Sequence, residues 1–207
     1  MKRLIPLLIL PFLLACSQTD ELSPAVRTDL LCATTNAEGL VERLVLDNDQ
    51  SLRIDGQSIN ANAKSATLRC LCTYAVNADS TVATVYSISK TSCYAPIPAD
   101  SFDTRPMDPV NVVSVYKTGR FINLHLSMLT TGMTGTQYDL CLDSLTSDST
   151  ILHCSFLFKR VAADNESYTK HFYHSIPLNL ANYSHPFDSI FISVNTYDGM
   201  KQYKFER

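Results

Sequence analysis

The cysteine thiols are the most reactive side chains in this sequence, and the first of the seven stands apart from the others. Cys16 ends the tetrapeptide Leu13-Leu14-Ala15-Cys16, directly after an apolar run that begins at Leu4. A thiol can carry a diacylglycerol through a thioether bond, and the small residue before it gives a peptidase access to the bond that is cut. The pattern resembles a bacterial lipobox, which predicts acylation of Cys16 and removal of residues 1–15 as a signal peptide.

The residues around this motif fit an exported, lipid-anchored chain. Lys2 and Arg3 precede an apolar run that is shorter than the roughly 20 residues needed to cross a bilayer, as in a cleaved signal. An ordinary secretory signal with a chance cysteine is the alternative. Residues 16–27 are polar and unpatterned, so they are expected to form the lipid anchor and its tether. Membrane lipid, reached through acylated Cys16, is therefore one expected partner.

The expected location is the outer membrane. The acidic pair Asp20-Glu21 follows the acylation site closely and resembles the surface-export signal of Bacteroidetes lipoproteins. A chain anchored in this way is surface-exposed or faces the periplasm, and the residues leave both open.

The other six cysteines can oxidise in an exported protein, but six thiols allow 15 pairings. One pairing can be argued locally, on two predicted strands that flank the turn after Asp143. If Asp143 faces Leu152, Cys141 faces Cys154 at a distance suited to a disulfide. A shift by one residue would separate them, and two reduced cysteines buried on a strand face are the alternative. The pairing of the others stays open: Cys32, Cys70, Cys72 and Cys93.

No arrangement of residues predicts a catalytic site, a cofactor site or a metal site. The chain has six glycines and no nucleophile elbow, Walker loop, dinucleotide fingerprint or Cys-x-x-Cys motif. His171 and His174 would share a face on a helix but point in opposite directions on a strand. The oxygen-bearing residues Asp47, Asp49, Ser51 and Asp55 have the spacing of a calcium loop, but Leu52 stands where that loop needs glycine, which favours a hairpin turn at Asp47–Gln50. The expectation is a protein that is not an enzyme.

Composition and short motifs limit the partners. The formal net charge is −3 and neither half carries a basic patch, which argues against nucleic acid. Tyrosine and phenylalanine are frequent in the C-terminal half, where they can anchor a protein or glycan partner or fill a core. Three serines follow aspartate in tripeptides that resemble an O-glycosylation motif of exported Bacteroidetes proteins, although such tripeptides also arise by chance: Ser80, Ser144 and Ser149.

The elements that must position these side chains are strands throughout. The first cluster contains five predicted strands and suits a small Greek-key barrel of the OB type over residues 28–93. Its strands are predicted at 29–35, 40–46, 51–54, 66–76 and 81–92. Residues 94–109 contain four prolines and are expected to form a stiff linker between two domains.

The second cluster covers residues 110–207 and contains seven predicted strands. That number of strands in about 100 residues suggests an antiparallel β-sandwich made of two sheets. The predicted strands are 110–117, 120–129, 137–143, 150–158, 167–176, 188–195 and 201–205. The expected fold class is therefore all-β, with a small OB-like barrel followed by a seven-stranded sandwich.

Several of these stretches resemble the NigD-like lipoproteins of Bacteroidetes. The resemblance lies in the lipobox and in the runs at 44–49, 108–116, 119–126, 175–178 and 188–199. It implies an N-terminal OB-like barrel and a C-terminal sandwich, and it brings no catalytic residues. The stretch Leu68–Cys72 departs from the family, because an aliphatic strand is expected there.

The expected function is that of a non-enzymatic scaffold or binding protein in the cell envelope. Two alternatives stay open: a bacteriocin-associated accessory or immunity lipoprotein, as the family's name implies, and a glycan-binding surface module.

Overall fold

The computed structural model describes residues 25–56, 59–77, 81–130, 137–146, 150–160, 168–179 and 187–207. Within these ranges the chain forms fourteen β-strands and one 3₁₀ turn, η1 (Ala99–Ser101), so the predicted all-β class is confirmed. The predictions for Cys16, Ser80 and Ser149, and for most of the signal and tether, lie outside the described residues.

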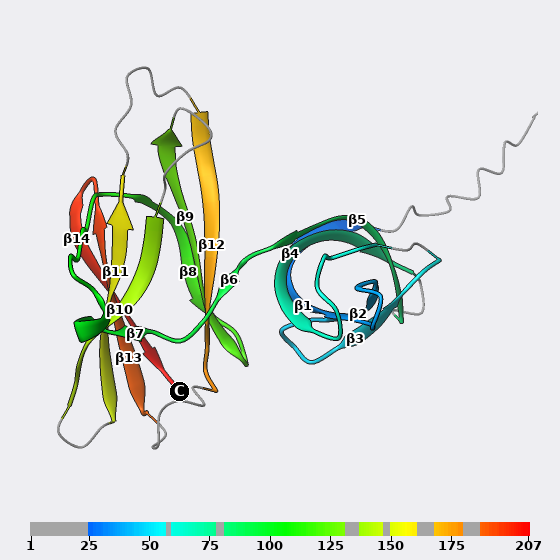
Figure 1. Cartoon of the computed structure of the whole chain (residues 1–207), viewed down its shortest axis with the longest axis horizontal. Helices are drawn as coiled ribbons and strands as arrows, with labels where there is room; N and C mark the ends of the chain where they lie inside the picture. The colour runs from blue at the N-terminus through cyan, green and yellow to red at the C-terminus, as the bar shows by residue number, and fades with distance from the viewer. Residues whose placement is uncertain are drawn as a thin grey trace, which may run out of the picture.

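The first five strands close into a barrel (Figure 1). Its strands are β1 (Val26–Thr35), β2 (Val41–Val45), β3 (Ser51–Ile54), β4 (Thr67–Val76) and β5 (Val82–Lys90). Their order around the barrel is β1-β2-β3-β5-β4, and only β3 and β5 pair in parallel.

Alternation along β4 builds the barrel core. Leu68, Cys70, Cys72 and Tyr74 all point inward, so the two cysteines share a face, as their spacing predicts. The alternate residues of β4 point outward, Arg69 among them. The predicted turn at Asp47–Gln50 joins β2 to β3, with Asp49 at a φ of 66° and the Asn48 side chain accepting a hydrogen bond from the backbone N–H of Gln50.

The remaining strands form two sheets packed face to face (Figure 1). The four-stranded sheet has the order β6-β12-β9-β8, and the five-stranded sheet has the order β14-β13-β11-β10-β7. Their bounds are β6 (Ser92–Cys93), β7 (Ile97–Pro98), β8 (Asn111–Lys117), β9 (Phe121–Thr130), β10 (Gln137–Leu145), β11 (Ile151–Lys159), β12 (Tyr168–Pro177), β13 (Ser189–Thr196) and β14 (Gly199–Glu206).

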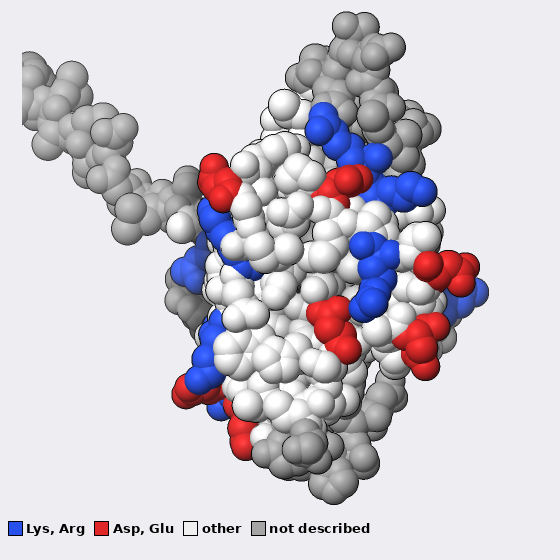
Figure 2. Space-filling model, turned by 90° about the vertical axis from the view of Figure 1, so that its left-hand side faces the viewer, with Lys and Arg blue, Asp and Glu red and all other residues white. Residues whose placement is uncertain are grey.

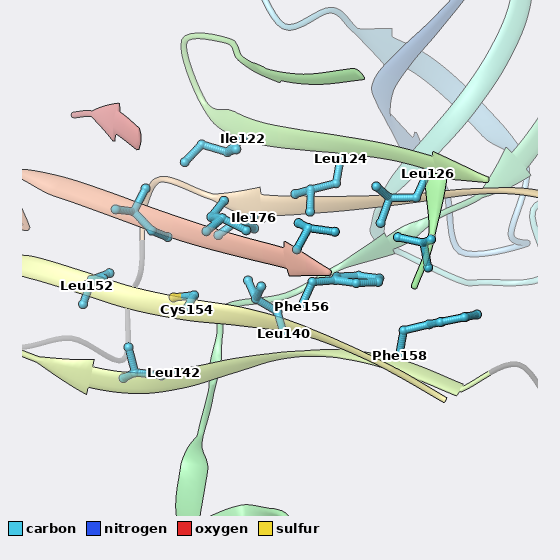
Figure 3. Close-up of a cluster of buried hydrophobic side chains, with 14 of the residues drawn as sticks. Ile122, Leu124, Leu126, Leu140, Leu142, Leu152, Cys154, Phe156, Phe158 and Ile176 are labelled. Carbon is cyan, nitrogen blue, oxygen red and sulfur yellow. The ribbon is translucent and has the colours of Figure 1, made fainter. Parts of the chain in front are cut away.

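Each of the seven strands predicted here has its counterpart in β8–β14. The expected antiparallel pairing is corrected for one neighbouring pair, because β11 and β13 run parallel. Between the sheets lies a core of large aliphatic and aromatic side chains. Figure 3 shows Ile122 and Leu124 of β9 facing residues of β10 and β11 such as Leu140 and Phe156.

The segment predicted to be a linker, residues 94–109, belongs to the sandwich instead. The chain leaves β5 at Lys90 and enters β6 at Ser92, where it pairs in parallel with β12. It then crosses to β7, which pairs in parallel with β10. Proline is tolerated on these edge strands because an edge position leaves one side of the backbone unpaired. The composition therefore indicated an extended segment correctly, but not that the five-stranded sheet would pair with it through β7.

The predicted opposition of Cys141 and Cys154 is also corrected. The register differs by one residue from the expected one: Cys141 faces Ser155 and Leu142 faces Cys154, and a bulge lies further along β10, between Leu142 and Ser144. The shift turns Cys154 into the core and Cys141 to the opposite face. Both thiols are free, as are those of the other described cysteines.

Candidate functional site: the junction of barrel and sandwich

Arg69 occupies the centre of the junction between the two domains. It lies on the outer face of β4, opposite Cys32 of β1, and is only 4% exposed. The surface that covers it is the outer face of the four-stranded sheet, where Asn123 of β9 and Ser175 of β12 are completely buried. Figure 1 shows the barrel set against this sheet.

The Arg69 guanidinium bonds both domains at once. Its two terminal nitrogens donate to the two carboxylate oxygens of Asp47 at 2.5 and 2.8 Å. Nε donates to Ser175 Oγ at 3.1 Å and Nη2 donates to Asn123 Oδ1 at 3.0 Å. The guanidinium carbon lies 4.0 Å from the centre of the Phe121 ring. A bidentate pair of this kind fixes geometry as well as charge.

Electrostatics keep this arginine charged. Burial opposes the charged form, but the hydrogen bond and charge of Asp47, aided by Cys32, outweigh it and raise the pKa of Arg69. The turn that carries Asp47 is also held from the sandwich side, where Arg120 forms an ion pair with Asp49 and bonds the carbonyl of Leu46. A buried ion pair stabilises little by itself, but removal of one partner leaves a buried charge uncompensated.

Three cavities surround this junction. One of about 570 Å³ has a basic lining of Lys117, Arg120 and Arg207 around Phe121. One of about 290 Å³ lies beside Asp47 and is lined by Asp29, Tyr74 and Tyr116, among others. The third, of about 510 Å³, opens between the barrel and β12; we call it the β4–β12 groove, lined by Leu71, Ser89, Lys90, Thr91, Ser92, Tyr138, His171, Phe172 and Tyr173.

A pair of histidines stands on the sheet beside this groove. His125 Nε2 and His171 Nδ1 are 2.9 Å apart and form a hydrogen bond. The Tyr173 ring stacks on His125 with centroids 4.3 Å apart. Burial, and then the neighbouring His171, lower the pKa of His125. In the sequence His171 lies three residues from His174, but its hydrogen-bond partner in the structure is His125 on another strand.

His174 points away from His171, as the strand prediction requires, but it is fully buried rather than exposed. Only 1% of it is accessible, and the Tyr94 ring meets it edge-on with centroids 4.4 Å apart. Burial lowers the pKa of His174 to about 4, and the nearby backbone of Tyr94 offsets part of that effect. The imidazole is therefore a neutral core side chain.

The buried thiols are poor nucleophiles. Burial is the main cause that raises the pKa of Cys70 to about 11 and of Cys72 to about 12. Burial also raises the pKa of Cys154. Since the thiolate is the reactive form, these side chains act as small hydrophobic residues.

The remaining site predictions fall in different places. Ser144 is exposed near the end of β10, opposite His153 of β11. Tyr138 and Phe172 stack in the sandwich core with centroids 5.1 Å apart, whereas Tyr168 and Tyr197 are exposed. The sequence reasoning missed Arg69, Asn123 and Ser175. The presence of Arg69 in an otherwise apolar strand could be noticed in the sequence, but the residues that bond it could not.

The outer face of the five-stranded sheet lies on the side away from the barrel. Figure 2 shows it as a largely uncharged surface on which basic and acidic side chains are interspersed. On this face His153 stacks on Phe191 with centroids 5.1 Å apart, and the Lys204 ammonium lies 5.9 Å from the same ring. Within the described ranges, no group of three histidine, cysteine, aspartate or glutamate residues is arranged to hold a metal ion. The same residues include no helix long and apolar enough to span a membrane.

Solved structures with the same architecture come from Bacteroides and Parabacteroides species. A NigD-like immunity protein from Bacteroides caccae aligns over 89% of this chain and 98% of its own, with a TM-score of 0.69 and 21% identity. The chain has the NigD-like fold. The predicted resemblance is therefore confirmed at the level of the fold.

Two further neighbours support the same alignment. A protein from Parabacteroides distasonis, described as a candidate toxin-related protein, covers 88% of this chain and 93% of its own at 16% identity and a TM-score of 0.67. A candidate lipoprotein from Bacteroides fragilis covers 88% and 98% at 13% identity and a TM-score of 0.65. No protein-family model and no curated protein matches the chain. In each neighbour the alignment extends over the barrel and the sandwich, so the two-part architecture is shared.

Proposed function

We propose that this protein is a NigD-like lipoprotein of the cell envelope, anchored to the outer membrane through acylated Cys16, and that it works as a non-enzymatic binding scaffold. The observation that carries this proposal is the motif Leu13-Leu14-Ala15-Cys16 at the head of a chain with this fold. The candidate lipoprotein of Bacteroides fragilis, which has the same architecture, supports it. The proposal assigns no catalytic residue and no cofactor.

The proposed scaffold is a rigid two-part unit. The Arg69 network bonds the barrel to Asn123 and Ser175, and a single residue, Thr91, separates β5 from β6. The barrel is proposed to be of the OB type, since its strand order of β1-β2-β3-β5-β4 suits that topology. Because β1 follows the tether, the barrel would lie nearer the membrane than the sandwich.

A more specific function is immunity to a bacteriocin-type toxin. The Bacteroides caccae neighbour is described as an immunity protein, which favours this alternative. The partner would then be a protein that meets the surface of the anchored scaffold. A glycan-binding role is the second alternative, and exposed aromatic residues such as Tyr168 and Tyr197 support it.

The anchoring is tested by intact mass and fractionation of the full-length protein expressed in a Bacteroides host. Acylated wild type should sediment with the outer membrane and carry the mass of its acyl chains. Cys16→Ser should lose both properties and keep its fold. Cys93→Ser, which removes a half-buried thiol of β6, is the matched control and should behave like wild type. A mature wild-type protein without acyl chains would overturn the proposal.

The function is tested on a deletion strain. Greater killing by a co-resident strain's secreted toxin, reversed by the wild-type gene, would select immunity. Unchanged sensitivity together with specific retention on a glycan array would select the glycan-binding role. The general scaffold proposal would fail if the purified protein turned over a substrate and that activity disappeared with a single point substitution.

A further inference from the structure

The register of β9 and β12 brings two histidines together on one sheet face. The strands are antiparallel, with Tyr173 opposite His125 and His171 opposite Ser127. The two imidazoles are therefore diagonal neighbours on the outer face, a relation within reach of ring side chains. His171 is exposed and His125 is half-buried, so both are accessible from solvent.

The distance between the two ring nitrogens equals the distance between two nitrogens that bind one metal ion at a right angle. An imidazole nitrogen lies about 2.0–2.1 Å from a divalent metal, so two nitrogens at right angles around it are about 2.9 Å apart. His125 Nε2 and His171 Nδ1 are 2.9 Å apart. A tetrahedral centre would need them about 3.3–3.4 Å apart by the same metal–nitrogen distance. Right-angled coordination by nitrogen is the tetragonal geometry that Cu²⁺ prefers.

The surroundings hold this pair in place and leave room for other ligands. Tyr173 stacks on His125 at 21° between ring planes, which restricts rotation of that imidazole. His171 and Tyr173 also line the β4–β12 groove of about 510 Å³. A metal on these two nitrogens would therefore have free coordination positions beside the groove.

We propose that His125 and His171 form an open two-histidine site for a divalent copper ion at the edge of the β4–β12 groove. Binding breaks the hydrogen bond between the rings, and each nitrogen donates its lone pair to the metal. The hydrogen on the donating nitrogen transfers through solvent to the other nitrogen of the same ring, so both imidazoles stay neutral. Water fills the remaining positions. Ni²⁺ and Zn²⁺ bind at the same place more weakly than Cu²⁺, in the order common to nitrogen sites.

Titration of the full-length mature protein in detergent tests the site. Ni²⁺ serves as the calorimetric probe because it does not oxidise the free thiols, and Cu²⁺ is followed by electron paramagnetic resonance. Wild type should show an axial copper signal with coupling to two nitrogens. His125→Ala and His171→Ala should each weaken binding by more than the roughly tenfold that loss of an outer-shell partner costs. His153→Ala is the matched control, because His153 is a single half-buried sheet histidine stacked on Phe191.

Two results would overturn the site. One is wild-type affinity in both single variants, and the other is wild-type protein whose copper signal shows one nitrogen or none. Circular dichroism checks that each variant is folded, and the milder His171→Gln repeats the test if an alanine variant is not. Broadening of the His125 and His171 ring signals by paramagnetic Ni²⁺, with those of His153 unaffected, would place the ion directly.

Discussion

The outer face of the four-stranded sheet has two parts that share strands but differ in what covers them. The lower part, with Asn123 and Ser175, is packed against the barrel, where both side chains are fully buried around Arg69. The upper part, with His125 and His171, is reached by solvent. Both parts consist of alternate residues of β9 and β12. Coverage by the barrel, rather than the residue types on β9 and β12, therefore decides whether these polar residues stabilise the fold or remain available to bind.

The largest effect is expected from a substitution in the junction between the barrel and the sheet. Asp47→Ala removes the carboxylate that pairs with buried Arg69, so it should lower the free energy of unfolding by about 3–5 kcal/mol. Urea denaturation followed by circular dichroism measures this. Asp49→Ala is the control, because Asp49 is exposed in its ion pair with Arg120 and should cost about 0–1 kcal/mol. Equal losses in the two variants would contradict the role assigned to the junction.

The next largest effect is a pH dependence of stability that should arise from the buried face of β12 and not from its exposed face. The pKa of buried His174 is about 4 in the folded chain, against about 6.5 in an unfolded one. Between these values only the unfolded chain takes up the proton, so stability is complete above pH 6.5 and is lost as pH falls towards 4. The loss should reach about 3 kcal/mol.

Stability curves of variants isolate this contribution from the carboxylates that titrate in the same range. His174→Leu should flatten the slope of unfolding free energy against pH in that interval. Thr169→Ala, on the exposed face of the same strand, should leave the slope unchanged, because neither side chain titrates. A slope that is the same in wild type and His174→Leu would show that this histidine does not contribute.

A smaller effect is expected from the sandwich side of the junction. Asn123→Ala removes the oxygen that accepts hydrogen bonds from Arg69 and from Ser175, and should cost about 1–3 kcal/mol because these groups stay buried. Ser127→Ala, further along the same face of β9, should cost less. Denaturant midpoints with unchanged slopes measure both, and a larger loss for Ser127→Ala would reverse the comparison.

The smallest effect is expected in the uncovered part. His171→Gln should change the free energy of unfolding by no more than about 0.5 kcal/mol, as substitutions at exposed positions usually do. Thermal unfolding without added metal measures this. A loss above about 2 kcal/mol, typical of buried positions, would mean that the upper part of the sheet also supports the fold.

Strand content was predictable because it depends on local alternation. Leu68, Cys70 and Cys72 alternate with outward residues, and this period alone placed a half-buried strand there. The turn at Asp47–Gln50 was predictable for the same reason, since its polar residues favour a reversal of the chain. Local patterns of this kind need no knowledge of distant partners.

Pairing between distant strands could not be predicted in the same way. The register of β10 and β11 places Cys141 opposite Ser155 rather than Cys154, and nothing in the local sequence specifies this offset of one residue. The segment at 94–109 looked like a linker because its prolines favour extended backbone, and its edge pairing with β10 through β7 depends on residues far along the chain.

Short-range patterns in the sequence were sufficient for the all-β class and for the apolar face of strands such as β4, and they predict the lipid anchor at Cys16. These features follow from short-range patterns, in which each residue's type and its neighbours are sufficient. Only the tertiary structure decided that Arg69 would be buried, that His125 would meet His171, and that His174 would lie in the core. Those outcomes depend on strand register and on which surface the barrel covers, and both are set by contacts between residues far apart in the chain.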